Sequence, residues 1–93
     1  MKQTEDIKIF SAYLKMLENH YFDTIVTHTF EEMRKNKTEQ TKNAFEKSLE
    51  KYLKQDFLEN VVFDDFKTAI LEKFIKRIAN KTEKILMENS TQK

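Results

Sequence analysis

Apolar and polar positions recur with helical spacing along most of this chain. Between residues 7 and 18 the polar side chains fall within one narrow arc of a helical wheel, and they are Lys8, Ser11, Lys15 and Glu18. The other positions are apolar, which predicts a first helix over this segment. Thr4 is suited to cap it, because Glu5 and Asp6 follow in the first turn, where the helix dipole favours acids.

The apolar stripe shifts by about half a turn after residue 18. The next apolar residues would emerge, in an uninterrupted helix, close to the side that was polar before; they are Phe22, Ile25, Val26, Phe30 and Met33. This shift predicts a break near Asn19 and His20, followed by a second helix over residues 21–35, since Asn is tolerated at helix ends. One bent helix across both segments is the alternative.

A third helix and a connector follow. Residues 36–38 form the expected loop, and Thr38 is the expected N-cap of a helix that runs to about Lys54. This helix has a thin apolar stripe and is expected to be peripheral; the stripe consists of Thr41, Phe45, Leu49, Tyr52 and Leu53. A capping-box pattern from Asp56 to Glu59 then opens a bent connector that reaches Phe63.

Asp64 or Asp65 is expected to cap the last helix. Its broad apolar face consists of Ile70, Leu71, Phe74, Ile75, Ile78, Thr82, Ile85 and Leu86. The pattern as a whole predicts an all-α fold, a small antiparallel helical bundle of four main helices with a short connector before the last. We expect a single domain over residues 1–93, with frayed ends at about 1–4 and 88–93.

The 93 residues include no glycine and no proline, the two residue types that most disfavour a helix interior. Their absence agrees with a chain that is helical almost throughout. It also excludes Walker loops, G-x-G-x-x-G turns and nucleophile elbows, because each depends on glycine for a tight backbone approach. Eight Phe and three Tyr supply the large apolar area that the core of so short a chain requires.

The chain has no cysteine, which excludes disulfides, thiolate catalysis and zinc sites built on thiolates. Glu5 and Asp6 interrupt the segment where a signal peptide needs an apolar core, and no apolar run approaches the length of a membrane span. We therefore expect a cytoplasmic protein without membrane contact. By size and class alone it is comparable with small helical inhibitors, immunity proteins and DNA-binding accessory factors of bacteria and phages.

One cluster has the residue types of a metal site, namely His20, Asp23, His28, Glu31 and Glu32. His28 and Glu32 are four residues apart and share a helical edge, which can supply two ligands, but a stable site needs a third and usually a fourth. A catalytic triad would combine either histidine with Ser11, Ser48 or Ser90, but no spacing favours one of these combinations. We expect no catalytic, metal-binding or cofactor-binding residue.

The first helix has more apolar surface than one-sided packing requires. Its core face is complete with Ile7, Phe10, Leu14 and Leu17, and a second stripe remains, formed by Ile9, Ala12, Tyr13 and Met16. One interpretation is that the helix lies centrally, with neighbours on both sides. The other is that the second stripe binds a partner, since Tyr and Met are enriched in protein interfaces.

The last helix has a basic stripe formed by Lys73, Arg77, Lys81 and Lys84. Such a stripe can neutralise phosphates or receive an acidic partner. The alternative is that the long Lys stems lie along the rim of an apolar face and keep their charges in water. We favour this second interpretation, because no aromatic residues are interleaved with the stripe and the formal net charge is only +1.

These observations favour a non-enzymatic protein-binding module, an adaptor, inhibitor or immunity-type factor. It is expected to bind another protein or a second copy of itself through Ile9, Ala12, Tyr13 and Met16. No small-molecule substrate is expected. The alternative is a nucleic-acid-binding accessory protein that uses the basic stripe of the last helix. An enzyme ranks third and would require His28 or several carboxylates to converge in a pocket.

Overall fold

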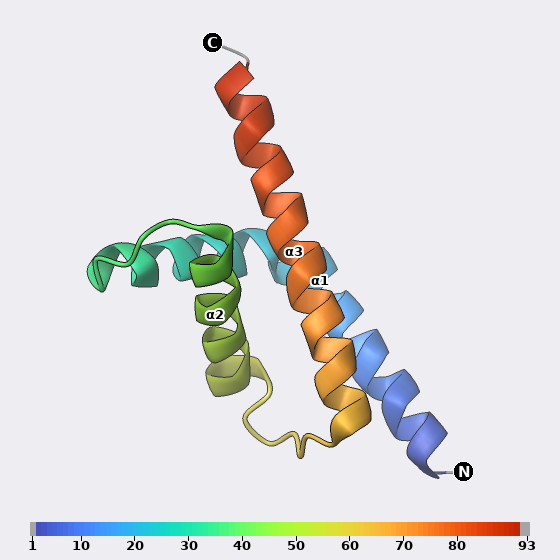
Figure 1. Cartoon of the computed structure of the whole chain (residues 1–93). Coiled ribbons are helices and arrows are strands. Elements are labelled where there is room, and N and C mark those ends of the chain that lie inside the picture. Colours follow the sequence, from blue (N-terminus) through green and yellow to red (C-terminus); the bar gives the residue numbers. More distant parts are fainter. Residues whose placement is uncertain (1, 92–93) are drawn as a thin grey trace.

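The computed structural model describes the backbone of residues 2–91 and the side chains of residues 5–88. It contains three α-helices, α1 (Lys2–Lys35), α2 (Lys42–Tyr52) and α3 (Asp65–Thr91), and a π-helical turn, η1 (Leu53–Phe57), that directly continues α2 (Figure 1). The described residues contain no strand, so the predicted all-α class is confirmed. None of their helices is long and apolar enough to cross a membrane.

The predicted break at Asn19 and His20 is wrong, because α1 is one continuous helix. Its first half buries Phe10, Leu14 and Leu17, whereas its second half buries Ile25, Thr29 and Met33. Each step of four residues in this second set turns the buried side by about 40°. The shift of the stripe is thus real, and a gradual rotation along one helix accommodates it.

The two halves of α1 run in clearly different directions (Figure 1), so the alternative of one bent helix holds. The hydroxyl of buried Thr29 donates a hydrogen bond of 2.7 Å to the carbonyl of Ile25, one turn earlier, which satisfies a polar group inside the second half of α1.

The helices are not arranged as an antiparallel bundle of four. Contacts between the first half of α1 and α3 advance in the same direction along both: Phe10 meets Phe63 just before α3 begins, and Glu18 meets Arg77. These two segments are therefore parallel. The predicted bundle is wrong in helix number, because α1 replaces two helices, and in the direction of the α1–α3 pair.

α2 lies between the second half of α1 and α3, and it is not peripheral as predicted. Its first turn places Phe45 against Phe30 of α1, with ring centroids 5.1 Å apart. Farther along, Leu49 is fully buried, as is Leu53 at the start of η1. The stripe of α2 is thin because these few large side chains suffice to fill the space between two neighbouring helices.

The loop between α1 and α2 ends α1 without glycine. The amide of Thr38 donates to the carbonyl of Met33, and the amide of Lys37 donates to that of Arg34. This is the hydrogen-bond pattern of a Schellman motif, whose left-handed position is usually glycine. Here Lys37 occupies it, with a φ of 55°.

α2 begins at Lys42 and is capped by Thr41, whose side-chain oxygen accepts a hydrogen bond of 3.1 Å from the amide of Ala44. The predicted cap, Thr38, instead belongs to the end of α1. At α3 the prediction is confirmed, since Asp64 Oδ1 accepts a hydrogen bond of 2.8 Å from the amide of Lys67.

Between α2 and α3, the predicted capping box at Asp56 is replaced by η1. The amide of Leu58 donates to the carbonyl of Leu53, five residues earlier, which closes the wider ring of a π-turn. Residues 58–64 then form the connector to α3.

The core is one continuous cluster of apolar side chains from all of these elements. Its buried members are Phe10, Leu14, Leu17, Ile25, Met33, Phe45, Leu49, Leu53, Leu58, Leu71, Phe74, Ile75, Ile78 and Ala79. The frayed ends expected at 1–4 and 88–93 stay a prediction. α1 begins at Lys2, before the expected cap Thr4, and α3 continues to Thr91; residues 1, 92 and 93 and the side chain of Thr4 lie outside the described part of the chain.

Candidate functional site

The structure places most of the predicted partner-binding stripe on the solvent-facing side of α1. Ile9 is 67% exposed and Met16 is 40% exposed, and Ala12 between them is exposed as well. Tyr13 differs from these three, because it is half-buried and its hydroxyl donates a hydrogen bond of 3.0 Å to the carbonyl of Phe57 in η1. Tyr13 therefore holds α1 to η1, and Ile9, Ala12 and Met16 remain available to a partner.

Ile9 also borders a groove between α1 and the connector, which we call the α1–connector groove. The groove has a volume of about 380 Å³, and its lining consists of Asp6, Ile9, Phe10, Tyr13, Asn60, Val61, Val62 and Lys67. Val62 is the most exposed of the large apolar side chains that the structure describes, at 82%. The walls are thus apolar, and Asp6 and Lys67 supply one charge of each sign.

The sequence analysis missed Val61 and Val62. Their position in the sequence could have indicated an exposed apolar pair. They lie in the connector between Leu58 and the cap of α3, where they are not part of the buried face of a helix. The sequence analysis places both valines in the bent connector before the last helix and gives them no binding role. In the structure only Val61 is half-buried.

A polar pocket lies where the second half of α1 meets α2 and η1. It has a volume of about 320 Å³ and is lined by His28, Glu32, Asn36, Ser48, Lys51, Tyr52, Gln55 and Asp56. The structure thereby brings His28 and two carboxylates into one pocket. It does not bring His20 or Asp23 there, since both lie exposed elsewhere on α1.

His28 is positioned in this pocket by ring stacking. Its ring centroid lies 3.9 Å from that of Tyr52. Its Nε2 lies 3.9 Å from Glu32 Oε1, which is too long for a hydrogen bond. Its Nδ1 is buried without a hydrogen-bond partner among the described residues.

The chemistry of the polar pocket is limited by these distances. Burial, and then the negative charge of Asp56, raises the pKa of the Tyr52 phenol, which moves this hydroxyl further from ionisation at neutral pH. Within the described residues no group of His, Asp and Glu side chains is arranged to hold a metal ion. Nor does any hydrogen bond found among them join His28 to Ser48, whereas an activated nucleophile requires such a link to its base.

The basic stripe of α3 faces the first half of α1, and a carboxylate of α1 pairs with two of its members. Glu18, whose side chain is only 15% exposed, lies 2.7 Å from Arg77 and 3.8 Å from Lys81. The ammonium of Lys81 also lies 4.5 Å from the ring centroid of Phe22. Lys73 and Lys84 lie exposed on the same edge of α3.

A second groove, the α1–α3 groove, runs beside this stripe. It has a volume of about 310 Å³ and is lined by Ser11, Leu14, Lys15, Ile70, Lys73, Phe74 and Arg77. Lys15 was assigned to the solvent arc of an isolated helix. Parallel packing of α1 against α3 brings it to the groove that Lys73 and Arg77 also line.

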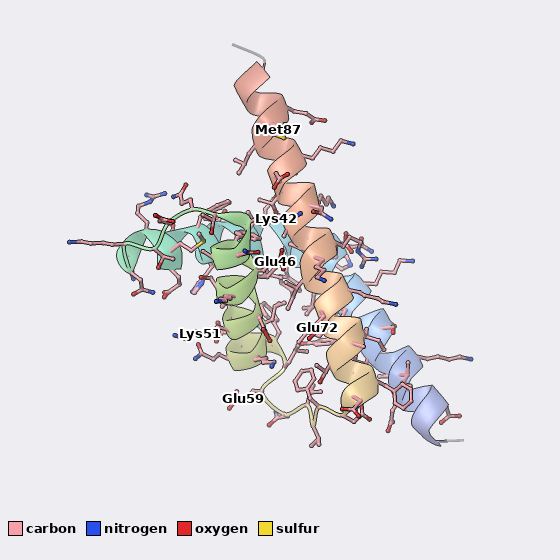
Figure 2. All side chains as sticks on the ribbon, in the orientation of Figure 1. Lys42, Glu46, Lys51, Glu59, Glu72 and Met87 are labelled. Carbon is pink, nitrogen blue, oxygen red and sulfur yellow. The ribbon has the colours of Figure 1, made fainter. Side chains whose placement is uncertain are left out.

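The opposite side of α3 borders a cleft with more acidic residues. Glu46 on α2 and Glu72 on α3 lie along the gap between the two helices (Figure 2). Glu50 lies in the same cleft, together with Lys47 and Lys76. The molecule thus presents a basic groove on one flank of α3 and a mixed, mainly acidic cleft on the other.

Comparison with known protein families, curated proteins and solved structures finds no match to this chain. Function is therefore argued from the surfaces of the molecule and their chemistry.

Proposed function

We propose that this chain is a non-enzymatic protein-binding module, of the adaptor, inhibitor or immunity type, and that the α1–connector groove is its interface. The observation that carries the proposal is the pairing of Ile9 with Val62. These are two strongly exposed apolar side chains from different elements, and they line the same groove. Exposed apolar surface that is contiguous across elements is typical of a binding site.

The energetics favour this groove over the rest of α1. Full burial of an Ile or Val side chain contributes about 1.5–3 kcal/mol, and Ile9 and Val62 are still largely exposed. The Tyr13–Phe57 hydrogen bond fixes one wall in place. A preformed wall lowers the entropy cost of binding, because fewer side chains must be ordered when the partner arrives.

A second copy of the chain is the partner that this surface fits best. In a two-fold symmetric dimer the same patch meets itself, so each charge must face its opposite. The groove has Asp6 and Lys67 in its lining, which satisfies this condition when Asp6 of one protomer faces Lys67 of the other. Met16 lies on the same side of α1 as Ile9 and extends the apolar area.

Sedimentation equilibrium over a range of protein concentrations tests the proposal. The wild-type chain is expected to shift from monomer to dimer, and Val62→Glu is expected to stay monomeric, because a carboxylate would be buried in the contact. The matched control is Leu86→Glu, which changes an apolar side chain of α3 that is 49% exposed and lies outside this groove. It should dimerise like the wild type.

A charge exchange adds a test of the arrangement. Asp6→Lys alone should weaken the dimer, and the double variant Asp6→Lys with Lys67→Glu should restore it, because opposite charges face each other again. A wild-type chain that is monomeric at every concentration would overturn self-association. Equal weakening by Leu86→Glu and Val62→Glu would overturn the placement of the interface.

A further inference from the structure

The α1–α3 groove gathers positive charge from two helices. Lys15 comes from α1, and Lys73 and Arg77 come from α3. None of the described side chains that line the groove is acidic. The carboxylate of Glu18, which is outside the lining, pairs with Arg77. Lys15 and Lys73 are exposed and make no ion pair with a described residue.

Arg77 is held in position before any ligand arrives. Glu18 binds one end of its guanidinium at 2.7 Å, and the guanidinium carbon lies 5.7 Å from the ring centroid of Phe74. A guanidinium has five N–H donors in a rigid plane, so one carboxylate leaves several of them for a second anion. Bidentate binding of phosphate is the common use of such a group.

The basic edge of α3 continues beyond the groove. Lys81 and Lys84 follow Arg77 on the same side of α3, and the distance from Lys73 to Lys84 along the helix axis is about 16 Å at about 1.5 Å per residue. One strand of B-DNA has a phosphate about every 3.4 Å of axis. The basic edge is therefore long enough to follow several consecutive phosphates.

Among the described side chains that line the groove, the aromatic ring is that of Phe74, and it is buried. Phe66 on the same side of α3 is 57% exposed, but it lies outside the lining and is a single ring. Proteins that bind single strands rely on stacking of bases on exposed aromatic rings. Contacts to phosphates alone carry no sequence information, so binding through them has the same strength for duplexes of any base sequence.

We propose that the α1–α3 groove binds the phosphate backbone of duplex DNA, without sequence preference, through Lys15, Lys73 and Arg77. Glu18 limits the affinity, because it competes with phosphate for Arg77 and Lys81. This activity is separate from protein binding, since the α1–connector groove shares no lining residue with the α1–α3 groove.

Fluorescence anisotropy with a labelled duplex DNA of mixed sequence, repeated over a salt series, tests this inference. Binding is expected at low salt, with a slope of about −0.9 in log K against log salt for each phosphate contacted. Lys15→Gln and Lys73→Gln should each weaken binding and reduce the slope by about 1. Lys76→Gln, on the flank of α3 that faces α2, is the matched control and should change neither.

Glu18→Gln supplies a test in the opposite direction, since it frees Arg77 and Lys81 and should strengthen binding. No binding at low salt, or equal losses for Lys76→Gln and Lys15→Gln, would overturn the groove as the site. Polyglutamate that displaces the labelled duplex as effectively as unlabelled duplex does would indicate a site for acidic peptides and would overturn the DNA assignment. Repeating the titration with Val62→Glu keeps the result independent of dimerisation, because that variant leaves every groove residue in place.

Discussion

The imidazole of His28 lies flat on the phenol ring of Tyr52, with ring centroids 3.9 Å apart and planes inclined by 18°. The stack joins the second half of α1 to the end of α2. It also leaves the His28 Nδ1 atom buried without a hydrogen-bond partner among the described residues. The same side chain thus contributes a stabilising ring contact and a destabilising polar atom.

Replacing His28 separates these two effects. His28→Phe keeps a ring against Tyr52 and removes the unpaired nitrogen, so the free energy of unfolding is expected to rise by about 1 kcal/mol. His28→Ala removes the stack as well and should lower it by about 1 kcal/mol. Urea denaturation of the two variants beside the wild type measures both changes. A fall with His28→Phe would mean that Nδ1 is paired in solution.

The raised pKa of Tyr52 makes stability depend on pH in the alkaline range. Burial and then Asp56 hold this pKa above 10.0 in the folded chain, while the phenol of the unfolded chain titrates near about 10. The unfolded state therefore loses its proton first. The contribution of protonated Tyr52 to stability is complete below pH of about 10 and is lost as the pH rises through the folded value.

Urea denaturation at a series of alkaline pH values, for wild type and Tyr52→Phe, measures this loss. The wild type should lose stability more steeply with rising pH, because the variant has no phenol at this position to titrate. Asp56→Asn should make the wild-type decline shallower, since one cause of the raised pKa is removed. Identical pH profiles for wild type and Tyr52→Phe would contradict the prediction.

The hydrogen bond from Tyr13 to the Phe57 carbonyl joins α1 to η1 across 44 positions of sequence. Tyr13→Phe should lower the free energy of unfolding by about 1 kcal/mol, the usual value of one such bond. Tyr21→Phe is the matched control. Tyr21 also lies on α1 and contacts Phe57 through its ring, and no hydrogen bond of its hydroxyl is found among the described residues. Equal effects of the two substitutions in urea denaturation would contradict a role for the hydroxyl of Tyr13.

Lys37 occupies a left-handed backbone position with a side chain, at a φ of 55°. Glycine has no Cβ and adopts this conformation without steric cost. Lys37→Gly should therefore raise the free energy of unfolding by about 1 kcal/mol, and Lys35→Gly, inside the last turn of α1, should lower it by a similar amount. Thermal denaturation of both variants shows whether each substitution raises or lowers stability. A loss of stability in both would contradict the Schellman motif at the end of α1.

Local signals in the sequence predicted the parts of the fold that depend on local chemistry. Asp64 was among the two expected caps of α3, because an Asp before an apolar run with helical spacing leaves few other choices. Phe10, Leu14 and Leu17 were expected in the core for the same reason and are buried. Thr38 and Thr41 offered two similar caps, and only the fold distinguishes them, since Thr38 completes the end of α1.

The sequence could not predict the direction of packing or the grooves that result from it. A shift of the apolar stripe is compatible with a break or with a gradual rotation, and spacing alone does not distinguish them. The buried side of α1 rotates gradually from Ile25 to Met33, because α2 packs against the side that becomes buried. Lys15 and Val62 became candidate site residues because of neighbours that are far away in sequence. A helical wheel shows the residues of one helix only and does not include such neighbours.

Parallel packing of α1 and α3 also determines how the chain responds to mechanical force. The N-terminal end of α1 and the C-terminal end of α3 lie at opposite ends of the molecule (Figure 1), whose longest dimension is 52 Å. Pulling these ends apart slides α1 along α3, so the contact of Phe10 with Phe63, just before α3, and that of Glu18 with Arg77 bear the load together, in shear. A helix pair with both pulled ends on one side would separate one contact at a time. The fold therefore resists extension along its own axis, with a forced-unfolding rate governed by the simultaneous rupture of the α1–α3 interface.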